Sequence, residues 1–325
     1  NLGCPLTFIG HGKLVSRPLQ AYYDILDKQF VQYFNDNGNL PLTVNGHLMP
    51  GKFELPGDVS SQFVSGLLFA LPLLKGDSEI IITSPLESAS YVDMTLNCLA
   101  KYGVKVENVD GAHRHYLVPG KQRFKAQDSK VEGDWSQAAF WTVGGALGAG
   151  ITASGVDFTS LQGDKAVVEI MQRMGADIAK TDDSVTVNSG ATQATIIDAS
   201  NCPDIIPVLT VLAAVSEGTT KIINAGRLRI KECDRLAAMT SELNKMGAEI
   251  TEEPEGLTIS GKPEGLRGGV EVDAWSDHRI AMSLAIAAQC CAEPITLTGA
   301  SSVSKSYPDF WEDYKSVGGK IEVLA

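Results

Sequence analysis

The chain has 325 residues, a hydrophobic content of 44% and a formal net charge of −12. This length and composition predict a globular protein with two domains, because a single hydrophobic core seldom grows beyond about 250–300 residues. The acidic charge argues against nucleic acid or an anionic membrane as a partner, since both attract basic surfaces.

The cysteines indicate an intracellular chain. All six (Cys4, Cys98, Cys202, Cys233, Cys290 and Cys291) lack CxxC pairing and metal-ligand spacing, which is typical of reduced thiols. The longest apolar run, Phe63 to Leu74, is too short to span a bilayer. We therefore expect a cytoplasmic protein without a metal site.

The first 46 residues predict a strand near Leu6–Ile9, a helix after Arg17-Pro18 and a strand ending in Leu42-Thr-Val-Asn-Gly. This order is the second half of a unit that recurs later in the chain. A sequence that begins in the middle of a unit predicts that an upstream segment is missing.

A short phrase recurs at the end of predicted helices: Lys101-Tyr-Gly-Val-Lys-Val, Arg173-Met-Gly-Ala-Asp-Ile, Lys245-Met-Gly-Ala-Glu-Ile and Ser316-Val-Gly-Gly-Lys-Ile. Its first glycines, Gly103, Gly175, Gly247 and Gly318, lie 72, 72 and 71 residues apart. A second phrase, such as Leu257-Thr-Ile-Ser-Gly, follows three of the copies. This regularity predicts a repeated supersecondary module.

Each module is expected to contain a helix, a strand, a helix and two strands. The first helix opens at a polar cluster, as in Asp58-Val-Ser-Ser-Gln and Trp275-Ser-Asp-His-Arg. The second helix is amphipathic, with Leu236, Met239 and Leu243 at helical spacing. The recurring glycine then ends that helix in the left-handed conformation, and an alternating strand follows. The Gly144–Gly150 cluster lacks dinucleotide-binding spacing, so we expect it to serve close packing.

A domain boundary is expected near the polar stretch 128–130. Residues 1–130 would then hold one and a half modules. Residues 131–325 would hold three modules, the last lacking its closing strand. Three modules per domain suit a pseudo-threefold arrangement with helices at the centre and small sheets outside.

Helix openings are the expected ligand sites, because free backbone N–H groups and the positive end of the helix dipole attract anions. Ser60, Ser61 and Gln62 stand at such an opening. Plain N-capping is the alternative explanation for a serine in this position.

Five cations stand at helix starts or in the loops before them: Arg17, Lys231, Arg235, Arg279 and Lys305. Lys231 and Arg235 are four residues apart and are expected on one helix face beside Glu232. The alternative is a solvated charged face. Jointly the five predict a substrate with several negative charges, since arginine binds phosphate and carboxylate in a bidentate manner. Asp204 and Glu232 are the candidates for proton transfer, although Asp204 also suits an N-cap.

Four motifs resemble the EPSP synthase family of enolpyruvyl transferases: Gly57-Asp-Val-Ser-Ser-Gln-Phe, Arg229-Ile-Lys-Glu-Cys-Asp-Arg, Ser276-Asp-His-Arg-Ile-Ala-Met and Lys305-Ser-Tyr-Pro-Asp-Phe. They occur in the family's order, and the similarity covers essentially the whole chain. The resemblance implies an α/β fold of six βαβαββ modules, arranged as a two-domain inside-out α/β barrel. It also implies that the first one and a half modules, and the N-terminal strand that completes the last module, are missing.

The family transfers the enolpyruvyl group of phosphoenolpyruvate to the 5-hydroxyl of shikimate 3-phosphate and releases phosphate, a step of aromatic amino acid biosynthesis. The reaction passes through a tetrahedral intermediate and needs no cofactor. The resemblance implies that Asp204 accepts the hydroxyl proton and that Glu232 helps deliver a proton to the methylene carbon. It assigns shikimate 3-phosphate to Ser60, Ser61, Gln62, Ser88, Asp204, Arg227 and Lys231, and phosphoenolpyruvate to Arg17, Gln62, Arg235, Arg279 and Lys305.

Two departures from the family pattern matter. Arg227 stands where some members have an asparagine that contacts the shikimate phosphate. The family's N-terminal Lys-Ser…Arg motif and its Gly-Asn-Ala-Gly-Thr loop are not in this sequence. We therefore expect little turnover from this chain alone, the missing N-terminal segment as its partner, and otherwise a monomer.

Two other functions compete. The sister enzyme that uses UDP-N-acetylglucosamine carries a cysteine five residues before the arginine of its Arg-Pro motif, where this chain has Gly12 before Arg17. A non-catalytic repeat scaffold is the second alternative. The presence of Asp204, Glu232 and the surrounding cations argues against it.

Overall fold

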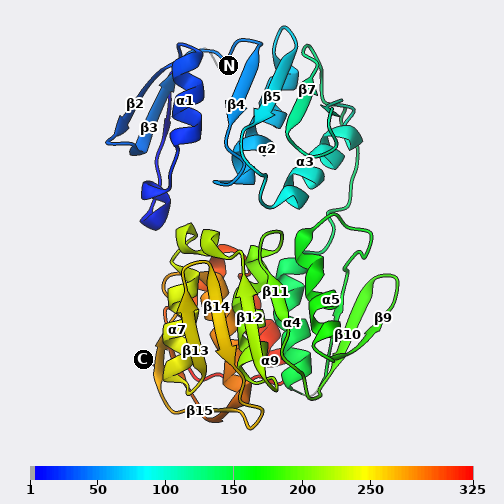
Figure 1. Cartoon of the computed structure of the whole chain (residues 1–325), viewed down its shortest axis with the longest axis vertical. Coiled ribbons are helices and arrows are strands. Elements are labelled where there is room, and N and C mark those ends of the chain that lie inside the picture. Colours follow the sequence, from blue (N-terminus) through cyan, green and yellow to red (C-terminus); the bar gives the residue numbers. More distant parts are fainter. Residues whose placement is uncertain (1–3, 149, 325) are drawn as a thin grey trace. The chain divides into compact units, whose positions relative to one another are not determined.

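The computed structural model describes residues 4–148 and 150–324 (Figure 1). The chain divides into two compact units. Unit 1 comprises Asn1–Lys130 and Leu161–Gly163, and unit 2 comprises Val131–Ser160 and Asp164–Ala325. The main division therefore follows the polar stretch 128–130.

Unit 1 contains two small sheets with helices packed against them. Its first sheet, in the order β1-β3-β2, is antiparallel. Its second sheet has the order β4-β5-β7-β6, in which only β4 and β5 are parallel. The elements are β1 (Leu6–Phe8), η1 (Gly12–Ser16), α1 (Gln20–Lys28), β2 (Gln32–Asp36), β3 (Asn39–Asn45), β4 (Lys52–Leu55), α2 (Ser61–Ala70), η2 (Leu71–Leu73), β5 (Ser78–Ile82), α3 (Ala89–Lys101), β6 (Glu107–Asn108) and β7 (His115–Val118).

Unit 2 begins with two stretches that each end in an antiparallel strand pair. The sheets have the orders β8-β10-β9 and β11-β12-β14-β13. The elements are α4 (Trp135–Leu147), β8 (Ile151–Ser154), η3 (Gly163–Lys165), α5 (Ala166–Arg173), β9 (Asp177–Lys180), β10 (Ser184–Asn188), β11 (Ile196–Asp198), η4 (Pro203–Ile205), α6 (Ile206–Ala214), β12 (Thr219–Ile223), η5 (Gly226–Ile230), α7 (Arg235–Lys245), β13 (Glu249–Glu253) and β14 (Gly256–Ser260).

The rest of unit 2 contributes two parallel strand pairs, β15-β17 and β16-β18. The elements are β15 (Leu266–Gly268), β16 (Glu271–Asp273), α8 (His278–Ala287), η6 (Ala288–Cys290), β17 (Cys291–Glu293), β18 (Thr296–Thr298), η7 (Ala300–Lys305) and α9 (Phe310–Ser316). The stretch from β11 to β14 has the order strand, helix, strand, helix, strand, strand, as does the stretch from β4 to β7.

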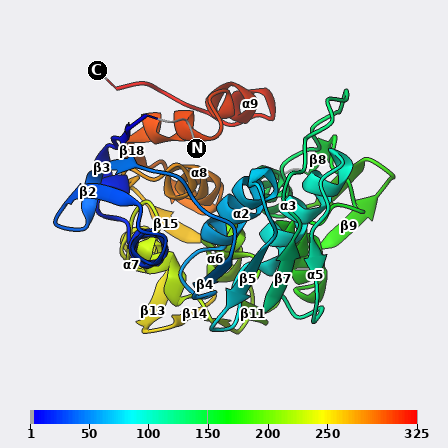
Figure 2. The ribbon, with the colours of Figure 1, turned by 90° about the horizontal axis from the view of Figure 1, so that it is seen from above.

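The core of unit 2 is built around α4, α6 and α8. Every residue of α6 and of α8 is buried, because these helices are apolar or small on nearly all sides. In Figure 2, α8 lies nearer the middle of unit 2 than the strands β11, β13 and β14. A side chain at Gly145 of α4 would meet the carbonyl oxygen of Val187 at 2.6 Å. The predicted close packing of the glycine cluster is therefore confirmed at this position.

The recurring glycines end their helices as predicted. Gly103, Gly175, Gly247 and Gly318 have φ angles of 80°, 87°, 104° and 99°, all in the left-handed region that glycine adopts without strain. The strands expected after them differ in length. After Gly103 only the two residues of β6 are paired.

The strand predicted after Gly318 is not formed in residues 319–324. A strand is held by hydrogen bonds to a neighbour, and no sheet of the described residues includes this segment. In the described part of the chain, every helix is also too short or too polar to traverse a bilayer.

Candidate active site

The stretch from Arg229 to Arg235 is not one helix, and the predicted shared helix face of Lys231 and Arg235 is wrong. Helix α7 begins only at Arg235, because the side chain of Asp234 caps it by accepting from the Ala237 N–H at 3.1 Å. Lys231 follows η5 in an extended conformation. Tertiary contacts nevertheless bring Lys231, Glu232 and Arg235 to one place.

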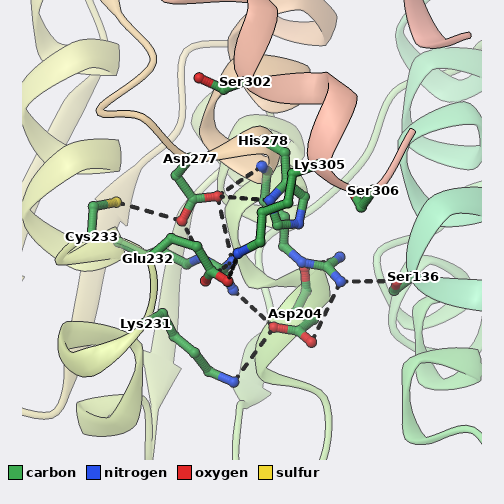
Figure 3. A network of polar contacts seen from close by, with 12 residues as sticks. Ser136, Asp204, Lys231, Glu232, Cys233, Asp277, His278, Ser302, Lys305 and Ser306 are labelled. Carbon is green, nitrogen blue, oxygen red and sulfur yellow. Dashed lines mark hydrogen bonds and ion pairs between the residues drawn. The ribbon is translucent and has the colours of Figure 1, made fainter. Parts of the chain in front are cut away.

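Arg235 lies at the centre of this group of charged side chains. Its side chain is 1% exposed. Its guanidinium donates to three carboxylates, Asp277, Asp204 and Glu232, which are labelled in Figure 3. Nε donates to Asp277 at 2.8 Å, one terminal nitrogen donates to Asp204 at 2.8 Å, and the other donates to Glu232 at 2.9 Å. A buried arginine of this kind is stable only because all three partners are charged and well placed.

Asp204 lies in η4, immediately before α6, and is shared by three cations. Besides Arg235, it meets the Arg279 guanidinium at 3.4 Å and the Lys231 ammonium at 3.7 Å. Arg279 also donates to the Ser136 hydroxyl at 3.1 Å and to the Asp204 backbone carbonyl at 3.2 Å. Burial acts to raise the pKa of Asp204, but the charges of Arg279, Lys231 and Arg235 outweigh it and hold the pKa well below its ordinary value.

Glu232 forms a second carboxylate position in the cluster. It accepts from Arg235 and from the Lys305 ammonium, which reaches it from the end of η7. Burial acts to raise the pKa of Glu232, whereas the charge of Arg235 and the hydrogen bond from Lys305 lower it below its ordinary value. The two candidate proton-transfer groups therefore share Arg235.

Lys231 and Arg227 form one edge of the cluster. Burial lowers the pKa of the Lys231 ammonium, Asp204 raises it, and the charges of Arg235 and Arg227 lower it further. Arg227, which is half-buried in η5, is close enough to Lys231 for its charge to lower the pKa of Lys231. The structure thus gathers the unit 2 residues of the predicted site.

The cluster carries a local excess of positive charge in an acidic chain. Arg235, Arg279, Lys231 and Lys305 face three carboxylates, Asp204, Glu232 and Asp277. With Arg227 nearby, the arrangement can bind an anion and move protons at the same place. Within residues 4–148 and 150–324, no group of three or more His, Cys, Asp or Glu side chains is placed to hold a metal ion.

The predicted residues of unit 1 lie at three places in that unit. Ser60 caps α2 by accepting from the Gln62 N–H at 3.3 Å, and Ser61 and Gln62 begin that helix. Ser88 is buried in the left-handed conformation, with a φ of 52°, directly before α3. Arg17 is half-buried at the end of η1.

Two residues of the cluster were absent from the predicted site. Asp277 was expected at a helix opening, in Trp275-Ser-Asp-His-Arg, but was given no role in the site. It is fully buried, caps α8 by accepting from the Arg279 N–H at 2.8 Å, and holds Arg235. Ser136, which binds Arg279, lies at the opening of α4. The polar openings of α4 and α8 were the signals that could have identified both residues.

Comparisons with known proteins support the same family that the sequence motifs resemble. The family model described as EPSP synthase (3-phosphoshikimate 1-carboxyvinyltransferase) matches residues 1–314. The 3-phosphoshikimate 1-carboxyvinyltransferase of Clostridium kluyveri is 54% identical over 321 residues, which cover 99% of this chain and 74% of that protein. The enzyme of the same name from Clostridium novyi is 52% identical over 317 residues, covering 98% and 72%.

Solved structures agree with the sequence relatives. EPSP synthase from Acinetobacter baumannii superposes with a TM-score of 0.81 and 27% identity, covering 99% of this chain and 76% of that one. The enolpyruvyl transferase NikO from Streptomyces tendae gives a TM-score of 0.73 at 19% identity, covering 93% and 72%. The second likeness concerns the α/β fold alone.

Proposed function

The chain belongs to the EPSP synthase family, and from this premise we propose that it acts as a 3-phosphoshikimate 1-carboxyvinyltransferase. It moves the enolpyruvyl group of phosphoenolpyruvate to the 5-hydroxyl of shikimate 3-phosphate and releases phosphate. The observation that carries the proposal is the unit 2 cluster, in which four cations surround Asp204 and Glu232. Two substrates that each bear phosphate and carboxylate need such a concentration of cations.

Asp204 is the proposed base that accepts the proton of the 5-hydroxyl. A carboxylate whose pKa is held low is a weak base, so its cation partners must change before the reaction. Substrate phosphate and carboxylate groups supply that change, because they compete with Asp204 for Arg279, Arg235 and Lys231. Binding of both substrates therefore raises the pKa of Asp204 at the moment when a base is needed.

Glu232 is the proposed proton carrier for the methylene carbon. When the 5-oxygen attacks C2 of phosphoenolpyruvate, a proton must be added to C3, which gives a tetrahedral intermediate with a methyl group. In the second step one methyl proton leaves and the C2–O bond to phosphate breaks. Lys305 and Arg235 fix both oxygens of Glu232 but also hold its pKa low. Glu232 can carry a proton once phosphoenolpyruvate competes for these two cations and its pKa rises. No cofactor is required.

Within each unit, the residues named by the family resemblance are assigned to a substrate. Arg235, Arg279 and Lys305 are assigned to phosphoenolpyruvate, and Lys231 with Arg227 to shikimate 3-phosphate. Unit 1 would add Arg17 to the first set, Ser60, Ser61 and Ser88 to the second, and Gln62 to both. The opening of α2 supports its assignment to an anion, because the positive end of the helix dipole lies there.

We also propose a fold in which each unit is an inside-out α/β barrel built from βαβαββ modules. Residues 1–130 and 131–325 would be its two domains, and the protein would act as a monomer. The buried helices α4, α6 and α8 support this proposal, because one helix of each unit 2 module lies in the core.

The test is phosphate release with both substrates, together with calorimetry for each substrate alone. Turnover of this chain alone is expected to be low, but any phosphate release should require both phosphoenolpyruvate and shikimate 3-phosphate, with the enolpyruvyl product seen by mass spectrometry. The Asp204→Asn variant should bind shikimate 3-phosphate but lower kcat by about 10²–10⁴-fold. Absence of both binding and product in the unsubstituted chain would overturn the proposed function.

The same assay separates the competing functions. Product formation with UDP-N-acetylglucosamine in place of shikimate 3-phosphate would favour the sister enzyme. Calorimetry that detects neither shikimate 3-phosphate nor phosphoenolpyruvate would favour the scaffold.

A further inference from the structure

A buried carboxylate outside the proposed site, Glu242, holds the segment that leads into α8. Glu242 lies on α7, two turns after Arg235, and is 1% exposed. One of its oxygens accepts from the Trp275 indole N–H at 3.0 Å and the Ser241 hydroxyl at 3.0 Å. The other accepts from the Asp273 backbone N–H at 3.0 Å and the Lys245 ammonium at 2.7 Å.

The segment held by Glu242 has an unusual backbone. Trp275 and Ser276 are consecutive non-glycine residues in the left-handed region, with φ angles of 53° and 54°. Each such residue costs on the order of 1–3 kcal/mol and persists only where its surroundings impose it. Asp273 adds to the restraint, because its side chain accepts from the Trp275 N–H at 2.6 Å and from the Thr298 hydroxyl at 2.8 Å.

This restrained segment places the residue that orients Arg235. Directly after Ser276, Asp277 accepts from the Arg235 Nε–H and caps α8 through the Arg279 N–H. Helix α7 therefore meets the opening of α8 twice, once through Arg235 and once through Glu242. Residues seven apart share one helix face, so the two contacts lie along the same side of α7.

We propose that Glu242 is a positioning residue for the site, which fixes the Asp273–Ser276 segment against α7 and so sets Asp277 and, through it, the guanidinium groups of Arg235 and Arg279. The link to catalysis rests on the proposed function, in which these two arginines hold phosphoenolpyruvate. Lys231 joins these contacts only through Asp204, which its ammonium meets at 3.7 Å, so binding of shikimate 3-phosphate depends less on Glu242 than binding of phosphoenolpyruvate does.

The informative variant is Glu242→Gln. Glutamine keeps the shape but has one accepting oxygen in place of two, so either the Trp275 indole or the Asp273 N–H and Lys245 must face an NH₂ group. The matched control is Glu249→Gln, the same change at an exposed position of β13.

The first measurement needs no substrate. Nitrogen NMR of the full chain resolves the indole N–H of Trp275, assigned with Trp275→Phe, and the Nε–H of buried Arg235. We expect both signals to shift in Glu242→Gln and neither to shift in Glu249→Gln. A shifted indole signal with an unchanged Arg235 signal would overturn the proposal, since Glu242 would then support only the loop.

The second measurement compares the KM for phosphoenolpyruvate with the KM for shikimate 3-phosphate. We expect the KM for phosphoenolpyruvate to rise roughly tenfold or more in Glu242→Gln, as for loss of a charged hydrogen bond, while the KM for shikimate 3-phosphate stays within about twofold. An equal rise in both values, or no rise, would contradict a positioning role. If the unsubstituted chain binds neither substrate, the proposed function fails while the Arg235 signal still tests Glu242.

A second variant covers the case in which Glu242→Gln does not fold. Trp275→Phe removes one donor and leaves the other three bonds to Glu242 intact. It should shift the Arg235 signal in the same direction by a smaller amount and show the same split in KM. An unchanged Arg235 signal in this variant would also overturn the proposal.

Discussion

The openings of α2 in unit 1 and α8 in unit 2 use the same local device with different consequences. In both, a side-chain oxygen of the N-cap residue accepts from the N–H two positions later. Ser60 is neutral and half-buried, and it holds the Gln62 N–H at 3.3 Å. Asp277 is charged and fully buried, and it also holds Arg235. An identical cap is therefore a local helix signal in one unit and part of a charged network in the other.

The comparison predicts that the α8 opening is far more sensitive to substitution. Asp277→Ala should lower the free energy of unfolding of unit 2 by about 3–5 kcal/mol, because it removes one partner of a buried ion pair. Chemical denaturation measures this loss. Asp309→Ala is the matched control, since Asp309 precedes α9 without a side-chain cap bond and should change stability by less than about 0.5 kcal/mol. Similar losses in both variants would remove the distinction between the two openings.

The charges near the α8 opening should also make unit 2 sensitive to acid. Burial and the charge of Arg279 lower the pKa of His278 to about 4. The unfolded chain, with a histidine pKa near 6.5, then binds more protons between these values, so stability falls as the pH drops from about 6.5 to about 4. The loss is on the order of 3 kcal/mol.

Protonation of Asp204 and Glu232 also lowers the stability of unit 2, but at lower pH. Their folded-state pKa values are lowered, so their contribution is present above the unfolded values near 4 and is lost on further acidification. The free energy of unfolding of unit 2, measured between pH 7 and pH 4, tests the contribution of His278. His278→Gln should flatten the curve in this range, and an unchanged slope would show that His278 is not its source.

A third prediction concerns the loop before α7, which is held from outside the cluster. Arg229 donates to Asp234 at 3.0 Å, to Glu252 at 2.6 Å and to backbone carbonyls in the turn of the β13–β14 hairpin. Arg229→Ala should lower the free energy of unfolding by roughly 1–3 kcal/mol and weaken binding of shikimate 3-phosphate through Lys231. Arg267→Ala, at an exposed position of β15, is the control for loss of an arginine. Equal effects of the two substitutions would contradict the anchoring role.

The smallest expected effect is at the α2 opening. Ser60→Ala should lower the free energy of unfolding of unit 1 by about 1 kcal/mol, the usual value for an N-cap. Ser60→Asn keeps a capping oxygen and should recover most of that loss. A loss as large as that of Asp277→Ala would mean that the α2 opening is also part of a larger network.

Much of the secondary structure followed from local sequence signals. Glycine at the end of each second helix, such as Gly175 and Gly247, identified the helix ends, because only glycine adopts that conformation without strain. Capping residues likewise identified the starts of α2 and α8. The signal was weakest for the stretch Arg229–Arg235, where the charge spacing suggested a helix but the cap at Asp234 delayed its start.

The sequence by itself determined the repeat, the positions of the caps and the family motifs, because these depend on residues close together in the chain. Only the tertiary structure decided that Asp204, Glu232 and Asp277 all meet the side chain of Arg235. These residues come from three separate segments of unit 2, and their partners are set by how α6, α7 and α8 pack. A buried charge is stable only beside its partners, so packing decides which capping residue also becomes part of a charged network.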